Sequence, residues 1–370
     1  MKFNPEYSTK ETLLALYQKP LLELVFEAAT IHREHHNPRE VQMSSLLSIK
    51  TGGCPEDCGY CPQAARYHTD VDAEGIMKVD DVLEQAKNAK INGSSRLCMG
   101  AAWREVKDNR DFDKVVEMVQ GVNDMGMEVC CTLGMMNENQ AKRLKNAGLF
   151  AYNHNLDSSK EFYSDVISTR EYDQRLDTID NARKAGISVC SGGIIGMGET
   201  EEDRMGLLMS YMEMENPPES IPINALVAVE GTPLEEQKPI EQWELIRMVA
   251  TTRIAFPESV VRLSAGRTKM SMEAQALCFM AGAGSIFAGD KLLTTPNPEF
   301  NEDKEMFSIL GLVAKESFAD GEQPVSNPDP IIIEKKRIAA EREAAYAKAK
   351  LNKSQKSFRP RMVTQVETLE

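Results

Sequence analysis

Short runs of apolar and β-branched residues alternate along the chain with longer segments of helical period. The runs predict eight strands, over residues 44–49, 95–100, 127–132, 149–155, 187–193, 221–227, 259–264 and 284–288. The segments between them predict amphipathic helices, among them 79–92, 112–125, 137–147, 172–185 and 242–255. Strands that alternate with helices indicate an α/β fold with a parallel sheet.

Eight such units favour a closed (β/α)8 TIM-type barrel, with an open doubly wound sheet as the alternative. In a barrel of this kind the active site lies at the carboxyl ends of the strands. The residues that follow each predicted strand are therefore the first candidates for chemistry.

The pattern changes at both ends of the chain. Residues 1–40 predict an N-terminal helical extension, with one helix over 11–36 whose Leu and Ala are spaced to cover one end of the barrel. The barrel is expected over 41–318. Residues 319–370 predict a breaker-rich linker, GEQPVSNPDP, and then a charged, flexible or helical tail with no role that the residues indicate.

The formal net charge is −14, which argues against a nucleic-acid groove. No apolar run is long enough to span a membrane, and the first residues lack the order of an export signal. We therefore expect a cytoplasmic protein. That compartment keeps thiols reduced, so the eight cysteines are expected to bind metal, to react or to pack, and not to form disulfides.

Three cysteines stand close together directly after the first predicted strand, in the sequence TGGCPEDCGYCP. Cys54, Cys58 and Cys61 are spaced so that three thiolates could hold three irons of a [4Fe-4S] cluster. The fourth iron would then stay open for an outside ligand, such as the amino and carboxylate groups of S-adenosylmethionine. Zinc is the alternative, but a structural zinc site would need a fourth Cys or His at knuckle spacing, and the loop has none.

Three more cysteines fall near the ends of predicted strands: Cys98, Cys130 and Cys190. Packed core thiols are the more common explanation, but a closed barrel would bring inward-facing thiols together. A [2Fe-2S] cluster would need a fourth ligand, for which Arg262 at the end of the seventh strand is the candidate. Arg262 could equally bind a substrate carboxylate or a buried acid.

Polar residues follow the fourth strand, where alternation places Asn153, Asn155 and Asp157 on one face. Such groups suit a polar small molecule or a hydrogen-bonded strand end. The glycine-rich run from Gly192 to Glu199 lacks the spacing of a dinucleotide-binding loop. Thr294 and Thr295 could hold a carboxylate or form a plain turn before a proline.

Seven segments, taken in order, resemble those of the biotin synthase family, within the radical S-adenosylmethionine superfamily. They are CPEDCGYCPQ, SRLCMGAAWR, EVCCTLG, YNHNLD, SVCSGGIIGMGET, VRLSAGR and KLLTTP, between about residues 40 and 300. The resemblance implies that Cys54, Cys58 and Cys61 bind the [4Fe-4S] cluster, and that Cys98, Cys130, Cys190 and Arg262 bind a [2Fe-2S] cluster that supplies sulfur. It selects Cys130 over the adjacent Cys131.

The resemblance also implies contacts with small molecules. Asn153, Asn155 and Asn224 are expected to bind the ureido ring of the substrate, and Thr294 and Thr295 its carboxylate. Tyr60, Asn155 and Asp157 are expected at S-adenosylmethionine, with Asp157 on the ribose. Ile194 is expected to pack on adenine, and Gly192 and Gly196 to allow close approach of the backbone.

The implied activity is that of a sulfurtransferase which converts dethiobiotin to biotin by radical chemistry. The family further implies a homodimer and an electron donor similar to flavodoxin or ferredoxin. Two rivals remain open: a radical enzyme of the same barrel class without sulfur insertion, such as a relative of hydrogenase maturases, and a non-catalytic zinc-binding scaffold.

Overall fold

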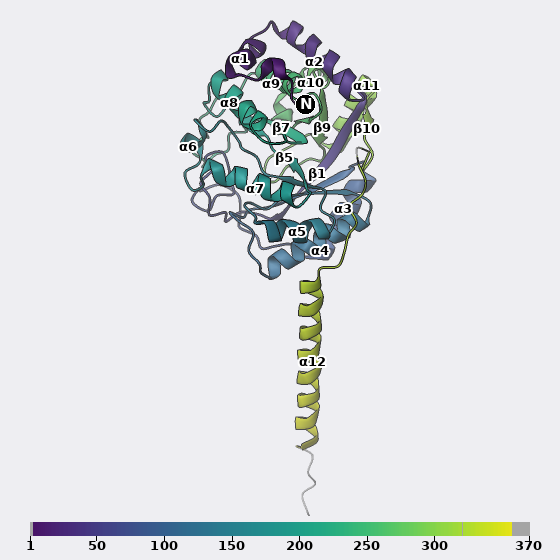
Figure 1. The fold of residues 1–370 in the computed structure, drawn as a ribbon. Coiled ribbons are helices and arrows are strands. Elements are labelled where there is room, and N and C mark those ends of the chain that lie inside the picture. Colours follow the sequence, from purple (N-terminus) through teal and green to yellow (C-terminus); the bar gives the residue numbers. More distant parts are fainter. Residues whose placement is uncertain (1–2, 320, 357–370) are drawn as a thin grey trace, which may run out of the picture. The chain divides into compact units, whose positions relative to one another are not determined.

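The computed structural model describes residues 3–319 and 321–356 (Figure 1). The chain divides into two units, Met1–Asn327 and Pro328–Glu370. The boundary falls within the stretch that was predicted as a linker.

The first unit is built around a closed parallel barrel (Figure 1). Its strands pair in the order β1-β2-β3-β4-β5-β7-β8-β9, and pairing of β1 with β9 closes the ring. This confirms the predicted (β/α)8 barrel and excludes the open doubly wound sheet. The strands are β1 (Glu40–Lys50), β2 (Arg96–Ala101), β3 (Glu128–Thr132), β4 (Ala151–Asn153), β5 (Ser188–Cys190), β6 (Gly193–Ile195), β7 (Ser220–Ala225), β8 (Val260–Leu263) and β9 (Ala283–Phe287).

The fifth predicted strand is divided into β5 and β6, which both pair with β7. The break lies opposite Pro222, which has no N–H to donate to the ladder. At the break, a Cβ on Gly192 would lie 2.0 Å from the carbonyl oxygen of Pro222. The two pieces therefore count as one member of an eight-membered ring in the described part of the chain.

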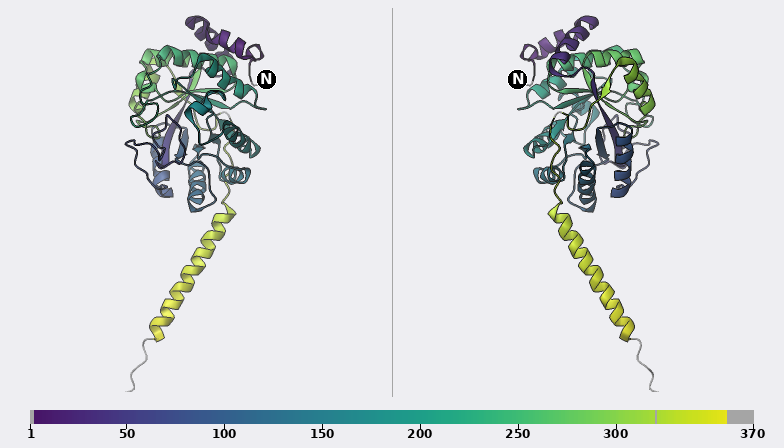
Figure 2. Two further views of the ribbon diagram at one scale, coloured as in Figure 1. Left: turned by 90° about the vertical axis from the view of Figure 1, so that its left-hand side faces the viewer. Right: turned by 90° about the vertical axis from the view of Figure 1, so that its right-hand side faces the viewer.

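The helices lie outside the strands, as the two views in Figure 2 show. Their apolar faces cover the barrel, and α4 is typical, with Phe112, Val115 and Val119 fully buried. Many begin at a side-chain cap, such as Asn109 at α4 and Thr200 at α8. The helices of this layer are α3 (Val79–Ile91), α4 (Arg110–Asp124), α5 (Glu138–Asn146), α6 (Tyr163–Val166), α7 (Tyr172–Lys184), α8 (Glu201–Met212), α9 (Gln242–Ala255), α10 (Met272–Met280) and α11 (Phe300–Leu310), with the short 3₁₀ turn η2 (Arg267–Lys269).

The N-terminal extension differs from its prediction. It holds the turn η1 (Pro5–Tyr7) and two helices, α1 (Lys10–Tyr17) and α2 (Leu21–His35), where one helix was expected. Pro20 separates the two because proline lacks the N–H that a continuous helix needs. Helix α1 packs against the outer helices α8 and α9, and helix α2 packs against α9 and α10, so the extension covers outer helices of the barrel.

After α11 the chain returns to the amino ends of the strands. The short strand β10 (Val313–Ala314) pairs with the start of β1, which the sequence did not predict. Ser317 Oγ then donates to the carbonyl of Ser95, and the Phe318 N–H donates to Glu128 Oε1 at 2.8 Å. Residues 312–318 are therefore fastened along one side of this end of the barrel.

In the second unit, α12 spans Pro330–Lys356. Arg337 forms ion pairs with Glu334 and Glu341 on neighbouring turns, as in a solvated helix.

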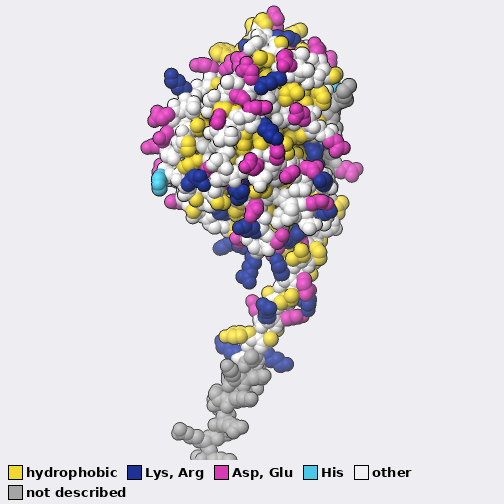
Figure 3. Space-filling model, turned by 60° about the vertical axis from the view of Figure 1, so that its left-hand side comes forward, with side chains coloured by type: hydrophobic (Ala, Val, Ile, Leu, Met, Phe, Trp, Pro, Cys, Tyr) yellow, Lys and Arg dark blue, Asp and Glu magenta, His cyan; other side chains and the backbone are white. Residues whose placement is uncertain are grey.

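Around the first unit, acidic side chains are interspersed with basic and apolar ones on the face shown in Figure 3. None of the described helices is both long enough and apolar enough to cross a membrane.

Candidate active site

A cavity of about 340 Å³ opens at the carboxyl ends of the barrel strands. Its lining combines thiols, amides, charged groups and apolar side chains drawn from most strands of the ring. The residues from the sequence prediction that line it are Cys54, Cys58, Tyr60, Cys61, Cys98, Asn153, Asn155, Asp157, Ile194, Asn224, Arg262, Thr294 and Thr295. The other four predicted residues, Cys130, Cys190, Gly192 and Gly196, lie outside this lining.

The loop that carries Cys54, Cys58 and Cys61 is held by its own backbone. The N–H of Cys54 donates to the Gln63 carbonyl at 2.9 Å, and the N–H of Cys61 donates to the Cys58 carbonyl at 2.9 Å. All three thiols are partly exposed to the cavity. The loop therefore turns three sulfur atoms toward one space.

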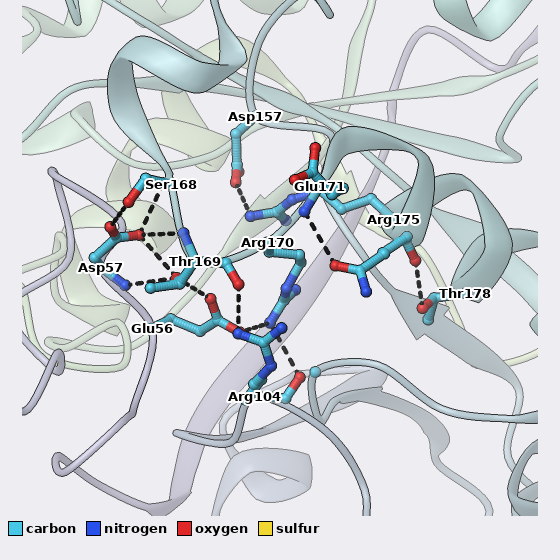
Figure 4. A network of polar contacts seen from close by, with 12 residues as sticks. Glu56, Asp57, Arg104, Asp157, Ser168, Thr169, Arg170, Glu171, Arg175 and Thr178 are labelled. Atoms are coloured by element: carbon cyan, nitrogen blue, oxygen red, sulfur yellow. Dashed lines mark hydrogen bonds and ion pairs between the residues drawn. The ribbon is translucent and has the colours of Figure 1, made fainter.

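Two acidic residues between the cysteines anchor this loop to the segment 168–170 (Figure 4). Asp57 Oδ1 accepts from the N–H groups of Ser168 and Thr169, each at 3.0 Å. Glu56 Oε1 is ion-paired with Arg170 at 3.0 Å and with Arg104 at 3.3 Å. These contacts fix the loop without any bound group.

Burial raises the pKa of the Cys58 thiol to about 12 and that of Cys61 to about 11. These thiols are neutral at ordinary pH unless a cation replaces their protons, which is how metal binding couples to thiol ionisation. In the described part of the chain, no three His, Cys, Asp or Glu side chains are close enough to hold a single metal ion.

A second group of sulfur atoms meets deeper in the barrel. Cys98 and Cys130 are partners across β2 and β3, and the two thiols share a hydrogen bond. Cys190 on β5 lies near Cys98 and Arg262, and all three thiols are buried. The hydrogen bond with Cys130, with help from Arg262 and Arg96, lowers the pKa of the Cys98 thiol.

Arg262 is almost fully buried beside these thiols. Its Nε donates to Ser285 Oγ at 2.9 Å, its Nη2 lies 3.3 Å from Ser44 Oγ, and its guanidinium covers the Phe287 ring. None of the partners recorded among the described residues is a carboxylate, so the buried acid considered as an alternative is not found there. A buried cation that faces only thiols and neutral groups fits an anionic cluster.

The adjacent Cys131 points away from this group. It pairs in register with Tyr152, whose hydroxyl donates to the Gly134 carbonyl at 2.6 Å. Burial raises the pKa of the Cys131 thiol. Because successive residues of a strand face opposite sides, only Cys130 reaches the lumen.

Beyond β4 the regular alternation ends, because Asp157 has a left-handed backbone with φ 69°. Even so, Asn153, Asn155 and Asp157 all line the cavity. Asp157 Oδ2 accepts from the Tyr60 hydroxyl at 2.7 Å and is ion-paired with Arg175 at 2.8 Å. The Asn155 side chain accepts from the Gly192 N–H at 3.1 Å.

The glycine-rich segment from Gly192 to Glu199 lies next to the cavity and supports its wall. Gly192 and Gly196 do not line the cavity, whereas Ile194 between them does. The carboxylate of Glu199 accepts from the N–H groups of Gly196 and Met197. Asn224 donates from Nδ2 to the Gly193 carbonyl at 2.9 Å, which uses part of the amide expected to bind substrate.

The loop after β9 bounds the cavity on the other side through Thr294 and Thr295. The Thr295 carbonyl accepts from the Leu292 N–H at 2.9 Å, so the segment does form a turn. Both threonines line the cavity all the same, and the turn does not exclude a role in binding.

Sequence reasoning missed the charged residues Glu56, Arg170 and Arg175, which also line the cavity. Arg175 lies on α7, where an arginine is usually solvated, and its side chain is only 6% exposed. The acidic pair between the cysteines was the one available signal, since Glu and Asp in a tight, buried loop need partners.

Comparison with known proteins agrees with this geometry. Residues 48–209 match the radical SAM superfamily, and residues 222–313 match the Biotin and Thiamin Synthesis associated domain. The chain is 66% identical over 318 residues to biotin synthase of Christiangramia forsetii, covering 86% of this chain and 88% of that protein. It is 55% identical over 325 residues to the mitochondrial biotin synthase of Arabidopsis thaliana, covering 87% and 86%.

Solved structures show the same fold at lower identity. Methylornithine synthase aligns with a TM-score of 0.71 and 18% identity over 83% of this chain and 94% of that chain. A maturase of the [FeFe]-hydrogenase aligns with a TM-score of 0.72 and 19% identity, covering 84% and 73%. From the curated relatives and the matched superfamily, the chain belongs to the biotin synthase family of radical S-adenosylmethionine enzymes.

Proposed function

We propose that this protein converts dethiobiotin to biotin by inserting sulfur between two carbons. One observation carries the proposal: Cys98, Cys130, Cys190 and Arg262 converge in the lumen, below a cavity whose rim holds Cys54, Cys58 and Cys61. A substrate in the cavity would then lie between the two sets of thiols.

Cys54, Cys58 and Cys61 would hold a [4Fe-4S] cluster with one iron left open. When bound, this cluster and S-adenosylmethionine together supply a carbon radical that removes hydrogen from an unactivated carbon. The task of the protein is to position the reactants and to exclude water. The anchored loop, with Glu56 and Asp57 bonded to 168–170, would keep the three thiols in place through loading.

S-adenosylmethionine would lie against the triad and the segment after β4. Asp157 is held by Tyr60 and Arg175 through one oxygen, Oδ2, so Oδ1 can still accept from ribose hydroxyls. Ile194, which is partly exposed to the cavity, would pack on the adenine. Gly192 and Gly196 would act indirectly, by letting the backbone place Ile194.

Dethiobiotin would lie deeper. Asn153 and Asn155 line the cavity beside Asn224, and amides can both donate to and accept from a cyclic urea. Thr294 and Thr295 would hold the carboxylate at the far end of the substrate chain. This arrangement would direct the reacting carbons toward Cys98 and Arg262 at the inner end of the cavity.

Cys98, Cys130, Cys190 and Arg262 would hold a [2Fe-2S] cluster as the sulfur donor. Cys130 is the ligand because Cys131 faces away from the lumen. The buried guanidinium of Arg262 would balance the negative charge of the thiolates and sulfides.

We further propose that the enzyme works as a homodimer in the cytoplasm, reduced by a protein similar to flavodoxin or ferredoxin. The eight cysteines are all free in the structure, which suits a reducing compartment. The family resemblance supports the dimer and the donor.

The test is an anaerobic assay of iron, acid-labile sulfide and visible absorption on the purified protein, with product analysis of three variants. We expect roughly six irons per chain, from one cluster of each type. Cys98→Ala, Cys130→Ala and Cys190→Ala are each expected to stop biotin formation while some cleavage of S-adenosylmethionine continues.

Each of the two alternative functions predicts a different result. A protein with about four irons that cleaves S-adenosylmethionine but makes no biotin would be a radical enzyme without sulfur insertion. A colourless protein that contains zinc would be the non-catalytic zinc-binding scaffold. Biotin formation at the wild-type level by any of the three cysteine variants would refute the role as sulfur donor.

A further inference from the structure

A second cavity, of about 410 Å³, lies at the opposite end of the barrel. Its lining includes the first residues of several strands, namely Arg96 of β2, Glu128 of β3, Ser188 of β5, Ser220 of β7 and Val260 of β8. We call it the lower cavity, and the one described above the upper cavity. The two cavities approach the buried thiols from opposite ends of the barrel.

The thiol group separates the two cavities. Cys98 and Arg262 line the upper cavity, whereas Cys190 lines the lower one. Ser188 is two residues before Cys190 on β5, so both side chains share the face that lines the lower cavity. Cys190 is fully buried at the inner end of the lower cavity, so a small species that enters there approaches Cys190 without crossing the space above.

Part of the wall of the lower cavity is formed by small side chains, which leave space between the larger ones. The interior of a (β/α)8 barrel is ordinarily filled by layers of bulky branched residues. Here Ala151, Ser188 and Gly284 stand at that level. A Cβ added to Gly284 would meet only a side-chain carbon of Val260, at 3.9 Å, so this position has free space.

Two of the three acidic groups in the lining, Glu128 and Glu219, are paired with neighbours, and the third, Glu258, is exposed. Glu128 is ion-paired with Arg96 at 2.6 Å and accepts from Gln42 at 2.9 Å. Glu219 is ion-paired with Arg183 at 2.9 Å and accepts from a backbone N–H. Because Glu128 and Glu219 are paired with cations, and Lys315 also lines the cavity, the wall does not repel small anions strongly.

We propose that the lower cavity is the port through which hydrosulfide and iron ions, ferric iron included, reach Cys98, Cys130 and Cys190. The inference rests on the proposed function, because it takes these thiols as a cluster site. Sulfur donation empties that site, while the upper cavity must hold S-adenosylmethionine and substrate. A separate entrance lets the site be reloaded from below.

The test narrows the port and follows loading of the full-length protein. Gly284→Leu and Ser188→Leu each place a larger side chain in the lower cavity, and Gly75→Leu is the matched control, because a Cβ there meets nothing within 4 Å. Iron-free protein is mixed anaerobically with ferric and ferrous iron and sulfide, so that the oxidation states of both clusters are supplied, in the presence of saturating S-adenosylmethionine and dethiobiotin. Bound iron and the visible absorption of each cluster type are followed with time.

We expect the second cluster to form roughly tenfold more slowly in both port variants, with the [4Fe-4S] cluster forming at the normal rate. The control should load both clusters like the wild type. Equal rates of second-cluster formation in wild type and port variants would overturn the proposal. The proposal would also be overturned if saturating S-adenosylmethionine and dethiobiotin slowed formation of the second cluster in the wild type. Iron and sulfide would then enter through the upper cavity, which these two ligands fill.

A second measurement does not depend on cluster formation. Iodoacetamide should alkylate Cys190 of the iron-free wild type, as identified by peptide mass spectrometry, and roughly tenfold more slowly in each port variant. The wild type could take up no second cluster while the labelling behaves as expected. The proposed function would then be wrong, but the lower cavity would still be the route of access to Cys190. Labelling that is equally fast in the port variants overturns the entrance itself.

Discussion

Glu56 and Arg170 form a buried ion pair at 3.0 Å, with their side chains 4% and 6% exposed. Glu56 lies between the first two cysteines of the triad, and Arg170 lies more than a hundred residues later, just before α7. A contact between such distant segments holds the cysteine loop against the barrel before any cluster is bound. The acidic residues of the loop therefore fix its position without any bound group.

Removal of Arg170 should release this loop. Among the residues that the structure describes, Arg170→Ala leaves the buried Glu56 carboxylate with the partly exposed Arg104 as its one cationic partner. We expect the free energy of unfolding to fall by about 3 kcal/mol. The [4Fe-4S] cluster should also be lost faster to a chelator. Urea unfolding and the decay of visible absorption under anaerobic conditions measure the two effects.

The matched control is Arg66→Ala. Arg66 also pairs with the cysteine loop, through Asp57 at 3.4 Å, but its side chain is 51% exposed. We expect a loss of at most about 0.5 kcal/mol and unchanged cluster retention. Equal effects of the two changes would mean that charge near the loop matters more than the buried contact.

The barrel itself was predictable because it follows from periodicity. Eight apolar runs became the ring, and helix α9 has the predicted bounds, 242–255. The division between β5 and β6 was not predictable in the same way, because it depends on Pro222 of a neighbouring strand. Proline and glycine are visible in the sequence, but which strands they oppose is a property of the register.

The thiols and amides of the site were found because they stand at strand ends, where a barrel brings side chains together. Arg175 was missed for the opposite reason: its place on a helix gives no sign that its guanidinium turns inward to Asp157. The lower cavity was also outside the reach of sequence reasoning. It depends on small residues such as Ala151 and Gly284 occurring at one level of different strands.

Adjacent cysteines on β3 should behave differently. We expect Cys130→Ala to lose the second cluster, whereas Cys131→Ala should keep it, because Cys131 is on the face that carries Tyr152. The lost packing of Cys131 should cost about 1 kcal/mol of stability. Iron and sulfide content of the two variants, purified in parallel, makes the comparison, and loss of two irons from Cys131→Ala alone would reverse the assignment.

Stability should fall in mild acid because of His32 on α2. Burial, together with the nearby charges of Arg253 and the stacked His36, lowers the pKa of His32 from 6.5 to about 3. Between these values the unfolded chain binds a proton that the folded protein does not. The free energy of unfolding should therefore decrease as the pH falls below about 6.5, by about 1.2 kcal/mol between pH 7 and pH 5.5 from this group alone.

His32→Leu removes the titrating ring and should make this dependence shallower by the same amount. Urea unfolding of both proteins at pH 7 and pH 5.5 gives the comparison, and the difference between them cancels the other titrating groups. Parallel pH profiles for the two proteins would show that His32 is protonated in the folded state as easily as in the unfolded one.

Gly192 should not tolerate even one added carbon. Its N–H is bound to the Asn155 side chain, and a Cβ would lie 2.0 Å from the Pro222 carbonyl oxygen, a backbone atom that no side-chain rotation can move aside. We expect Gly192→Ala to lower the free energy of unfolding by roughly 3 kcal/mol and to weaken S-adenosylmethionine binding, because Asn155 and Ile194 would shift with the backbone.

Gly75→Ala, at a position with nothing nearby, serves as the control for the lost glycine. Urea unfolding and equilibrium binding of S-adenosylmethionine to the two variants measure both effects. Wild-type stability of Gly192→Ala would show that β5 and β7 can separate here, and that the close approach of their backbones is not needed to shape the site.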